Sequence, residues 1–210
     1  GMVLPAVLGF LYNGWQGALG AFLLAGVTRL VCVQHCTFLI NSLCHTMGNR
    51  PYDSGTSARD SWLMAIFTFG EGYHNYHHSF QHDYRNGVKP WQWDPTKWAI
   101  WTLSKLGLVT DLRRVPEEKI VLAELREMKH QAETQIADSN ERKITCSTGQ
   151  EAYDKLLHLS QQLSDSYQEL ENAISDRIKI TGEMISHWRE ISSQVGVQLT
   201  RLRALQPALS

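Results

Sequence analysis

The sequence predicts an all-α protein that begins in a membrane and ends in a water-soluble tail. Residues 2–43 carry a single formal charge, Arg29, when His35 is counted as neutral. Residues 116–210 are instead rich in Glu, Lys, Arg, Gln and Ser, and apolar positions recur there with a helical period. The average composition, 43% hydrophobic and 20% charged over 210 residues, hides this contrast.

The membrane part is expected to comprise residues 1–45. Residues 2–12 are apolar but shorter than the roughly 20 residues that a helical span needs, so we expect the end of a span that begins upstream. Residues 13–17 predict a turn, and residues 18–43 predict one complete span. A buried core hairpin of a soluble protein is the alternative. Because Lys and Arg accumulate only after the second span, residues after about 45 are expected on the cytoplasmic side.

The middle of the chain, residues 46–130, predicts a helical cytosolic cap. Short helices are expected at residues 60–70 and 117–130. Residues 95–106 predict a helix at the membrane interface, with Trp and Leu inward and Lys97 and Lys105 outward. Ordinary core packing of these tryptophans is the alternative.

The tail is expected to be a linker at residues 131–149 followed by one long amphipathic helix over residues 150–205. An a/d seam predicts a coiled coil or a helix docked on a partner, and hence self-association through residues 150–205. The seam positions are Leu156, Ser160, Leu163, Tyr167, Leu170, Ile174, Arg177, Thr181, Met184, Trp188, Ile191, Val195, Gln198, Leu202 and Leu205.

Charge and cysteine usage exclude two classes of protein. A net charge of −1 favours no nucleic-acid partner. The four cysteines form no CxxC pair, so nothing indicates a disulfide framework.

The strongest chemical signal is the segment GEGYHNYHH at residues 70–78. On a helix, His74, His77 and His78 share one face. Converging imidazoles suit iron, copper, nickel or zinc, whereas calcium and magnesium prefer oxygen ligands. A solvated histidine-rich turn is the alternative.

A fourth histidine, His45, lies at the end of the second span. Asn41 precedes it by four residues and therefore shares its helical face. Beside the three later histidines, His45 becomes a candidate ligand, and Asn41 could hold a metal-bound water. Gln34 and Phe38 continue this face and could line a channel from the bilayer, although simple helix packing explains them equally well.

Taken together, these motifs resemble the membrane acyl-CoA Δ9 desaturases, and the stearoyl-CoA desaturase group most closely. The motifs are NSxxH at residues 41–45, RPYD at residues 50–53 and GEGYHNYHHSF at residues 70–80, in this order. The resemblance extends over residues 3–125. It implies four membrane helices and a cytosolic cap that holds two iron ions, with O₂ as co-substrate.

The resemblance also implies roles for individual residues. His74, His77 and His78 match the third histidine box of the family, and His45 matches its additional histidine. Asn41 matches the residue that reaches one iron through water. Glu71 and Asn75 would orient the imidazoles. Thr37, Phe38 and Ile40 fall where the family lines its acyl tunnel, although the family often has Trp in place of Phe38.

The implied reaction is the insertion of a cis double bond near carbon 9 of a fatty acyl chain, with acyl-CoA as the expected substrate. Two electrons would come from a carrier of the ferredoxin or cytochrome b5 type. The first two histidine boxes are absent from the chain, so we expect the C-terminal part of a longer enzyme, inactive by itself. A related hydroxylase or ketolase and a membrane-anchored coiled-coil interaction protein are the alternatives.

Overall fold

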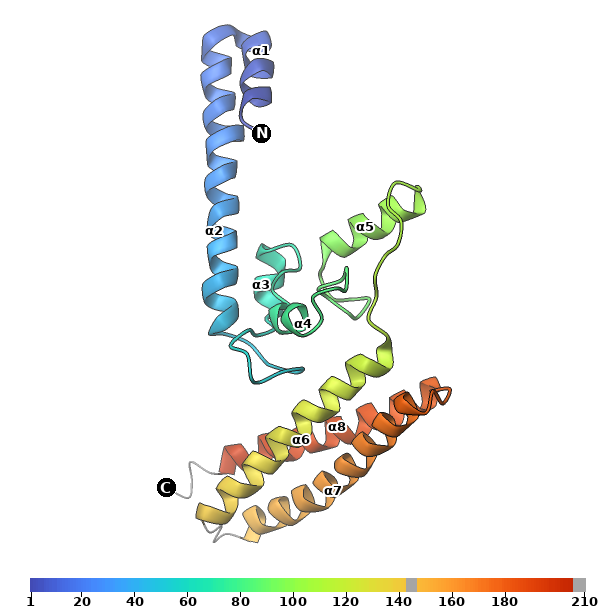
Figure 1. Ribbon diagram of the computed structural model, residues 1–210. Helices are drawn as coiled ribbons and strands as arrows, with labels where there is room; N and C mark the ends of the chain where they lie inside the picture. Colours follow the sequence, from blue (N-terminus) through green and yellow to red (C-terminus); the bar gives the residue numbers. More distant parts are fainter. Residues whose placement is uncertain (143–146, 206–210) are drawn as a thin grey trace. The chain divides into compact units, whose positions relative to one another are not determined.

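The computed structural model describes residues 1–142 and 147–205, and every regular element in these ranges is a helix, which confirms the all-α prediction. The chain forms two compact units. The first unit comprises residues 1–49, 57–78 and 84–111, and the second comprises residues 50–56, 79–83 and the chain from 112 onward. The elements in order are α1 Val3–Ala21, a π-helical stretch Phe22–Thr28, α2 Arg29–Ser42, a 3₁₀ turn Leu43–His45, α3 Trp62–Phe67, α4 His74–Ser79, α5 Pro95–Lys105, α6 Glu117–Arg142, α7 Ser147–Ser175 and α8 Gly182–Leu205 (Figure 1).

The first unit begins with a helical hairpin whose turn lies inside α1. Asn13 and Gly14 leave helical geometry, and Gly14 has a φ of 55°, which glycine adopts without steric cost. The two arms then run side by side (Figure 1). Gly9 and Gly17 meet across the hairpin so closely that a Cβ on either would collide with the carbonyl of the other. The turn predicted at residues 13–17 is therefore present.

One helical stretch in the described chain is long and apolar enough to cross a membrane by length and composition alone. It is Val3–His45, taken across its bend, with a mean hydropathy of 1.6 in its most apolar window. Only 6% of that window is buried within the protein. The number of separate spans and the side of the membrane reached after residue 45 stay predictions.

Helix α3 is packed against the segment that leads into α4. The Ser61 side chain caps α3 by accepting a hydrogen bond from the backbone N–H of Met64 at 3.4 Å. The backbone N–H of Ser61 donates to the carbonyl of Gly72 at 2.8 Å. A Cβ on Gly72 would collide with the backbone of Ala65, so glycine permits this close approach. The histidine segment is thereby fixed against α3.

One of the two lysines of α5 is placed differently from the prediction for residues 95–106. The Lys97 side chain is buried, with 7% exposed, and its ammonium donates to the carbonyls of Gly87 at 2.7 Å and Lys89 at 3.1 Å. The prediction that Lys97 faces outward is therefore wrong, because buried turn carbonyls need a donor and Lys97 supplies it. Lys105 is exposed, as predicted. The rings of Trp98 and Trp101 are exposed too, and their predicted place at a membrane interface stays a prediction.

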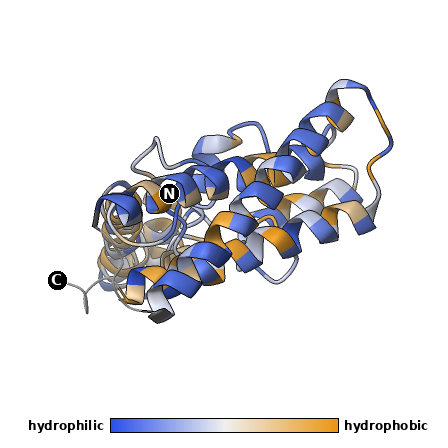
Figure 2. Cartoon of the chain, turned by 90° about the horizontal axis from the view of Figure 1, so that it is seen from below, coloured by the Kyte–Doolittle hydropathy of each residue, from blue (hydrophilic) through white to orange (hydrophobic). Residues whose placement is uncertain are grey.

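Helices α6, α7 and α8 of the second unit pack as a three-helix bundle. Helix α6 continues to Arg142 and α7 begins at Ser147, so most of the expected linker at residues 131–149 is helical, and residues 143–146 lie outside the described chain. Hydrophobic and hydrophilic residues form stripes along the helices in Figure 2, as amphipathic helices require. The bundle core includes these seam residues: Leu156, Leu163, Leu170, Trp188, Ile191, Val195 and Leu202.

The prediction of one continuous helix over residues 150–205 is wrong. Helix α7 ends at Ser175, where Arg177 takes a left-handed φ of 54° and the N–H of Ile178 donates to the carbonyl of Ala173 at 2.9 Å. Thr181 then caps α8 by accepting from the N–H of Met184 at 3.3 Å. The break between the helices thus includes Arg177 and Thr181, two polar positions of the seam, whereas the polar positions Ser160 and Gln198 lie within helices. Most apolar positions of the seam thus pack within this one chain, and self-association through residues 150–205 stays a prediction.

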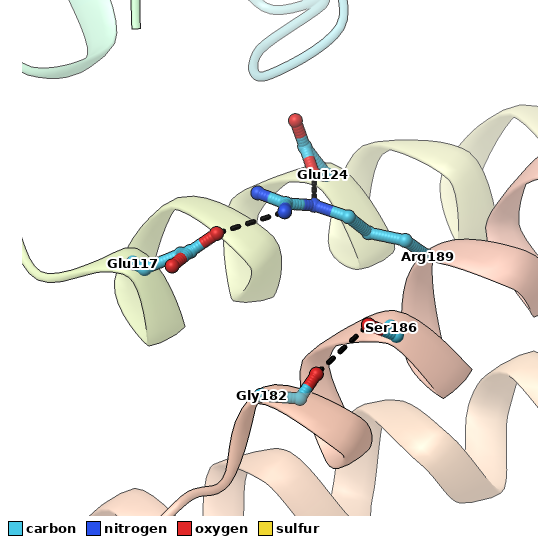
Figure 3. A network of polar contacts seen from close by, with 5 residues as sticks. All are labelled: Glu117, Glu124, Gly182, Ser186 and Arg189. Atoms are coloured by element: carbon cyan, nitrogen blue, oxygen red, sulfur yellow. Dashed lines mark hydrogen bonds and ion pairs between the residues drawn. The ribbon is translucent and has the colours of Figure 1, made fainter. Parts of the chain in front are cut away.

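A polar network on the bundle surface joins α8 to α6 (Figure 3). The guanidinium of Arg189 contacts the carboxylate of Glu117 at 2.8 Å and that of Glu124 at 3.8 Å. Because the side chains of Arg189 and Glu117 are 40% and 55% exposed, water screens this pair, and the apolar core dominates the stability of the bundle.

Candidate metal centre

Three histidine side chains converge within the first unit. His45 lies on the 3₁₀ turn after α2, while His74 and His78 lie one turn apart on α4. The Nε2 atom of His74 is 3.1 Å from Nε2 of His45 and 3.1 Å from Nε2 of His78. The three donor atoms all lie within 4.8 Å of one another. The two segments that sequence analysis singled out therefore meet in space.

The donor set of this cluster fits a transition-metal ion. Each Nε2 carries either one hydrogen or one lone pair, so Nε2 of His74 cannot satisfy both neighbours with a single hydrogen. Two nitrogens bound at right angles to one ion, each ~2.1 Å away, would be ~3.0 Å apart, close to the observed separations. The Nδ1 atom of His74 is buried without a hydrogen-bond partner among the described residues. One ion would therefore use the three Nε2 lone pairs better than any hydrogen-bonded arrangement.

The surroundings of His74 and His78 favour the neutral form of these two imidazoles. Burial, followed by the neighbouring imidazoles of His78, His45 and His77, lowers the pKa of His74 to about 4. Burial also lowers the pKa of His78, and His77 and His45 contribute to this shift. Neutral imidazoles present the lone pairs that a metal ion requires.

His77 lies beside this group but contacts a different partner. Its ring stacks on that of His74, with centroids 6.2 Å apart and planes inclined by 11°. Its Nδ1 atom is 3.2 Å from Oδ1 of Asn86, whose Nδ2 donates to Oε1 of Glu71 at 2.8 Å. Since the carboxylate of Glu71 can only accept, it fixes the orientation of the amide, and Nδ1 of His77 is the donor to Asn86. This hydrogen bond selects the tautomer in which a neutral His77 has its lone pair on Nε2.

Glu71 and Asn75, the two residues predicted to orient the imidazoles, differ in what they contact. Glu71 acts on His77 through Asn86, as described above. Asn75 is fully buried, and its Nδ2 donates to the carbonyl of Ala58 at 3.1 Å, while its backbone N–H donates to Oδ1 of Asp60 at 2.8 Å. Asn75 therefore anchors the start of α4 to the loop before α3.

The predicted site residues on α2 have surroundings of their own, away from the histidine contacts described above. The Asn41 side chain donates from Nδ2 to the carbonyl of Thr37 at 3.4 Å, along its own helix. Thr37 is exposed, Ile40 is half-buried, and Phe38 is 57% exposed. Their roles in holding a water ligand or an acyl chain stay predictions.

Sequence reasoning missed three residues that support the histidines. Ser57 Oγ is hydrogen-bonded to Nδ1 of His45 at 2.9 Å. Asp60 accepts the backbone N–H groups of Asn75 and Tyr76 at 2.8 and 3.1 Å, and burial raises its pKa to about 6. Asn86 supports His77. The sequence gives no signal for Ser57, whereas Asn86-Gly87 indicates only a turn.

The fold and the site together define a helical protein in which an apolar segment ends at a candidate histidine metal centre. The family model described as "Fatty acid desaturase" matches residues 1–106. The chain therefore belongs to the fatty acid desaturase family, and the resemblance predicted from its motifs is confirmed.

Individual relatives agree with this assignment. The chain is 44% identical over 119 residues to "Acyl-CoA desaturase 1" of Saccharomyces cerevisiae, which covers 56% of this chain and 23% of the relative. It is 46% identical over 106 residues to a "Probable acyl-CoA desaturase" of Schizosaccharomyces pombe, covering 50% and 22%. It is 40% identical over 116 residues to an "Acyl-CoA C20 Delta5-desaturase" of Anemone leveillei, covering 55% and 35%. The chain thus spans between 22% and 35% of the length of these relatives.

Proposed function

We propose that this chain is part of an O₂-dependent fatty acyl desaturase and that His45, His74 and His78 hold iron in it. The observation that carries the proposal is the convergence of three imidazoles, with Nε2 of His74 lying 3.1 Å from Nε2 of both His45 and His78, in a member of the fatty acid desaturase family. His77, with its lone pair on Nε2, is the fourth proposed ligand of a two-iron site. The first two histidine boxes of the family are absent from this sequence.

The chain's own residues would give the metal site its geometry. Bound iron, together with O₂ and two electrons, would supply the oxidising power that removing hydrogen from an unactivated methylene requires. Glu71 and Asn86 hold the tautomer of His77, and Ser57 holds Nδ1 of His45. Such partners keep imidazoles in one orientation and adjust their basicity. Two segments of the first unit would therefore supply the ligands in fixed orientations.

The substrate assignment is a proposal from the relatives and from α2. Two of the relatives described above carry acyl-CoA desaturase in their names, and the third is named for a Delta5 position. Introduction of a cis double bond near carbon 9 therefore rests on the motif resemblance. Thr37, Phe38 and Ile40 would line the acyl chain below His45, with Asn41 holding a water ligand. Electrons would come from a ferredoxin or cytochrome b5 type carrier on the cytoplasmic side.

The test expresses in a cellular host the full-length enzyme to which this chain would belong, and compares this parent enzyme with its His78→Ala variant. We expect the parent to yield a fatty acid lighter by two hydrogens, and the variant to lose both this product and bound iron. His82→Ala is the matched control, because His82 is an exposed histidine of the same sequence segment. A product heavier by one oxygen would favour a hydroxylase, and purified protein without iron would favour a structural interaction protein.

A further inference from the structure

We propose that Asp94 is a positioning residue for the candidate metal centre and that it acts on His77 through Asn86. The inference rests on the proposed function, because it assumes that His77 is a metal ligand. Asp94 lies on the loop before α5 and belongs to none of the histidine motifs.

Asp94 joins two segments through one buried carboxylate. The residue is 0% exposed. Its Oδ1 accepts the backbone N–H of Lys97 at 2.8 Å, which caps α5. Its Oδ2 accepts the backbone N–H groups of Asn86 and Gly87, both at 2.9 Å. Helix capping explains the contact with Lys97 only. The contacts with Asn86 and Gly87 need a separate explanation.

Asn86 transmits this anchor to the histidine. Its backbone is held by Asp94, and its side chain accepts from Nδ1 of His77 at 3.2 Å and donates to Glu71 at 2.8 Å. The amide is therefore fixed at both of its polar atoms and at its own backbone. A shift of the loop at Asn86 would rotate the acceptor away from His77 and free the imidazole to change tautomer.

Two neighbours of Asp94, Lys97 and Gly70, also constrain the loop that contains Asn86 and Gly87. The ammonium of Lys97 donates to the carbonyls of Gly87 and Lys89, on the loop that Asp94 binds by its N–H groups. Gly70, with a φ of 106°, lies against the carboxylate so closely that an added Cβ would be 2.6 Å from Oδ1. Gly70 precedes Glu71, so the carboxylate is packed against the segments that carry both partners of Asn86.

The experiment separates capping from positioning in the intact, detergent-purified protein. Co²⁺ is the probe, and its affinity is measured by competition with a chromophoric chelator. Serine is a good helix N-cap but is too short to bind α5 and the loop together, so Asp94→Ser should keep α5 and release Asn86. We expect Asp94→Ser and Asn86→Ala each to weaken Co²⁺ binding about tenfold, as loss of an orienting partner typically does. The double variant should bind no more weakly than Asn86→Ala alone.

Thr181→Ala is the matched control, because it removes an equivalent helix cap from α8 in the second unit. It should leave Co²⁺ affinity unchanged. Should Asp94→Ser not fold, Asp94→Asn serves in the same cycle, since it keeps the size of the side chain. Parental Co²⁺ affinity in a folded Asp94 variant, or additive losses in the double variant, would overturn the inference. Failure of the proposed function would look different. In that case the parent would bind Co²⁺ no better than its His74→Ala variant.

Discussion

Nε2 of His45 lies 3.1 Å from Nε2 of His74, although the two residues are separated by 29 positions in the chain. Backbone pairing of the intervening loop brings them together. The N–H of Arg59 donates to the carbonyl of Cys44 at 2.7 Å, and Asp60 accepts the N–H groups that begin α4. Consecutive residues of one loop thus hold the turn that carries His45 and the helix that carries His74.

Removing the partner of His45 should loosen the metal without removing a ligand. Ser57→Ala deletes the oxygen that lies 2.9 Å from Nδ1 of His45. We expect about tenfold weaker iron binding, measured as iron retained against a competing chelator. Ser42→Ala is the control, because the Ser42 hydroxyl donates along its own helix, to the carbonyl of Phe38. Equal iron retention in the two variants would refute a role for Ser57.

The pH dependence of the iron-free protein should reveal two opposing groups. The pKa of His74 is about 4 in the fold, below its ordinary value of 6.5, so acidification from 6.5 towards 4 protonates the unfolded chain first and costs stability. The pKa of Asp60 is about 6, above its ordinary value of 3.8, so falling pH in nearly the same window protonates the folded chain first and adds stability.

Asp60→Asn should therefore make the iron-free protein lose thermal stability more steeply between pH 6.5 and 4. Both backbone N–H contacts of Asp60 reach Oδ1, which an asparagine oxygen can replace. His74→Gln should have the opposite effect and flatten or reverse the acid loss. The measurement is the melting temperature of the parent and of both variants between pH 6.5 and 4, after a chelator has removed the iron. Parallel profiles for the two variants and the parent would disprove both assignments.

The sequence predicted the helices and the histidine cluster better than it predicted their supports. The spacing of His74 and His78 follows from helical periodicity, and it holds because α4 is helical over those residues. Lys97 could not be placed correctly, because helical periodicity does not reveal that the carbonyls of a preceding turn need a donor. Ser57 and Asn86 are beyond sequence reasoning for the same reason: their contacts depend on how loops cross.

In the tail, sequence periodicity predicted which residues are buried but not which helices they pack against. Apolar periodicity correctly selected Leu156, Leu163 and Trp188 as buried residues. It could not tell an intermolecular coiled coil from a chain that folds back on itself, because both bury the same seam. The chain folds back where Arg177 takes a left-handed conformation, and that conformation has no signature in a heptad pattern.

Replacing the buried ammonium of α5 should destabilise the first unit. Lys97→Met keeps the length of the stem but leaves the carbonyls of Gly87 and Lys89 without this donor. Unsatisfied buried acceptors cost about 1–3 kcal/mol, so a lower melting temperature is expected. Lys105→Met, on the exposed end of the same helix, should be nearly neutral. Equal melting temperatures for the two variants would show that the buried position of Lys97 is incorrect.

Two neighbouring residues on α8 should differ sharply in their effect on the bundle. Trp188 is 1% exposed and lies in the core, so Trp188→Ala is expected to cost about 3–5 kcal/mol in the free energy of unfolding. Arg189 makes exposed ion pairs with Glu117 and Glu124, so Arg189→Gln should cost less than about 1 kcal/mol.

Urea titration of the intact protein, followed by circular dichroism, gives both values, and salt separates their causes. The loss from Arg189→Gln should shrink further at high ionic strength, because salt screens exposed charges, whereas the loss from Trp188→Ala should not shrink. The bundle lies outside the residues that match the family model, so neither variant should change iron retention at the histidines. A Trp188→Ala variant that unfolds at the same urea concentration as the parent would show that the seam is not buried within one chain.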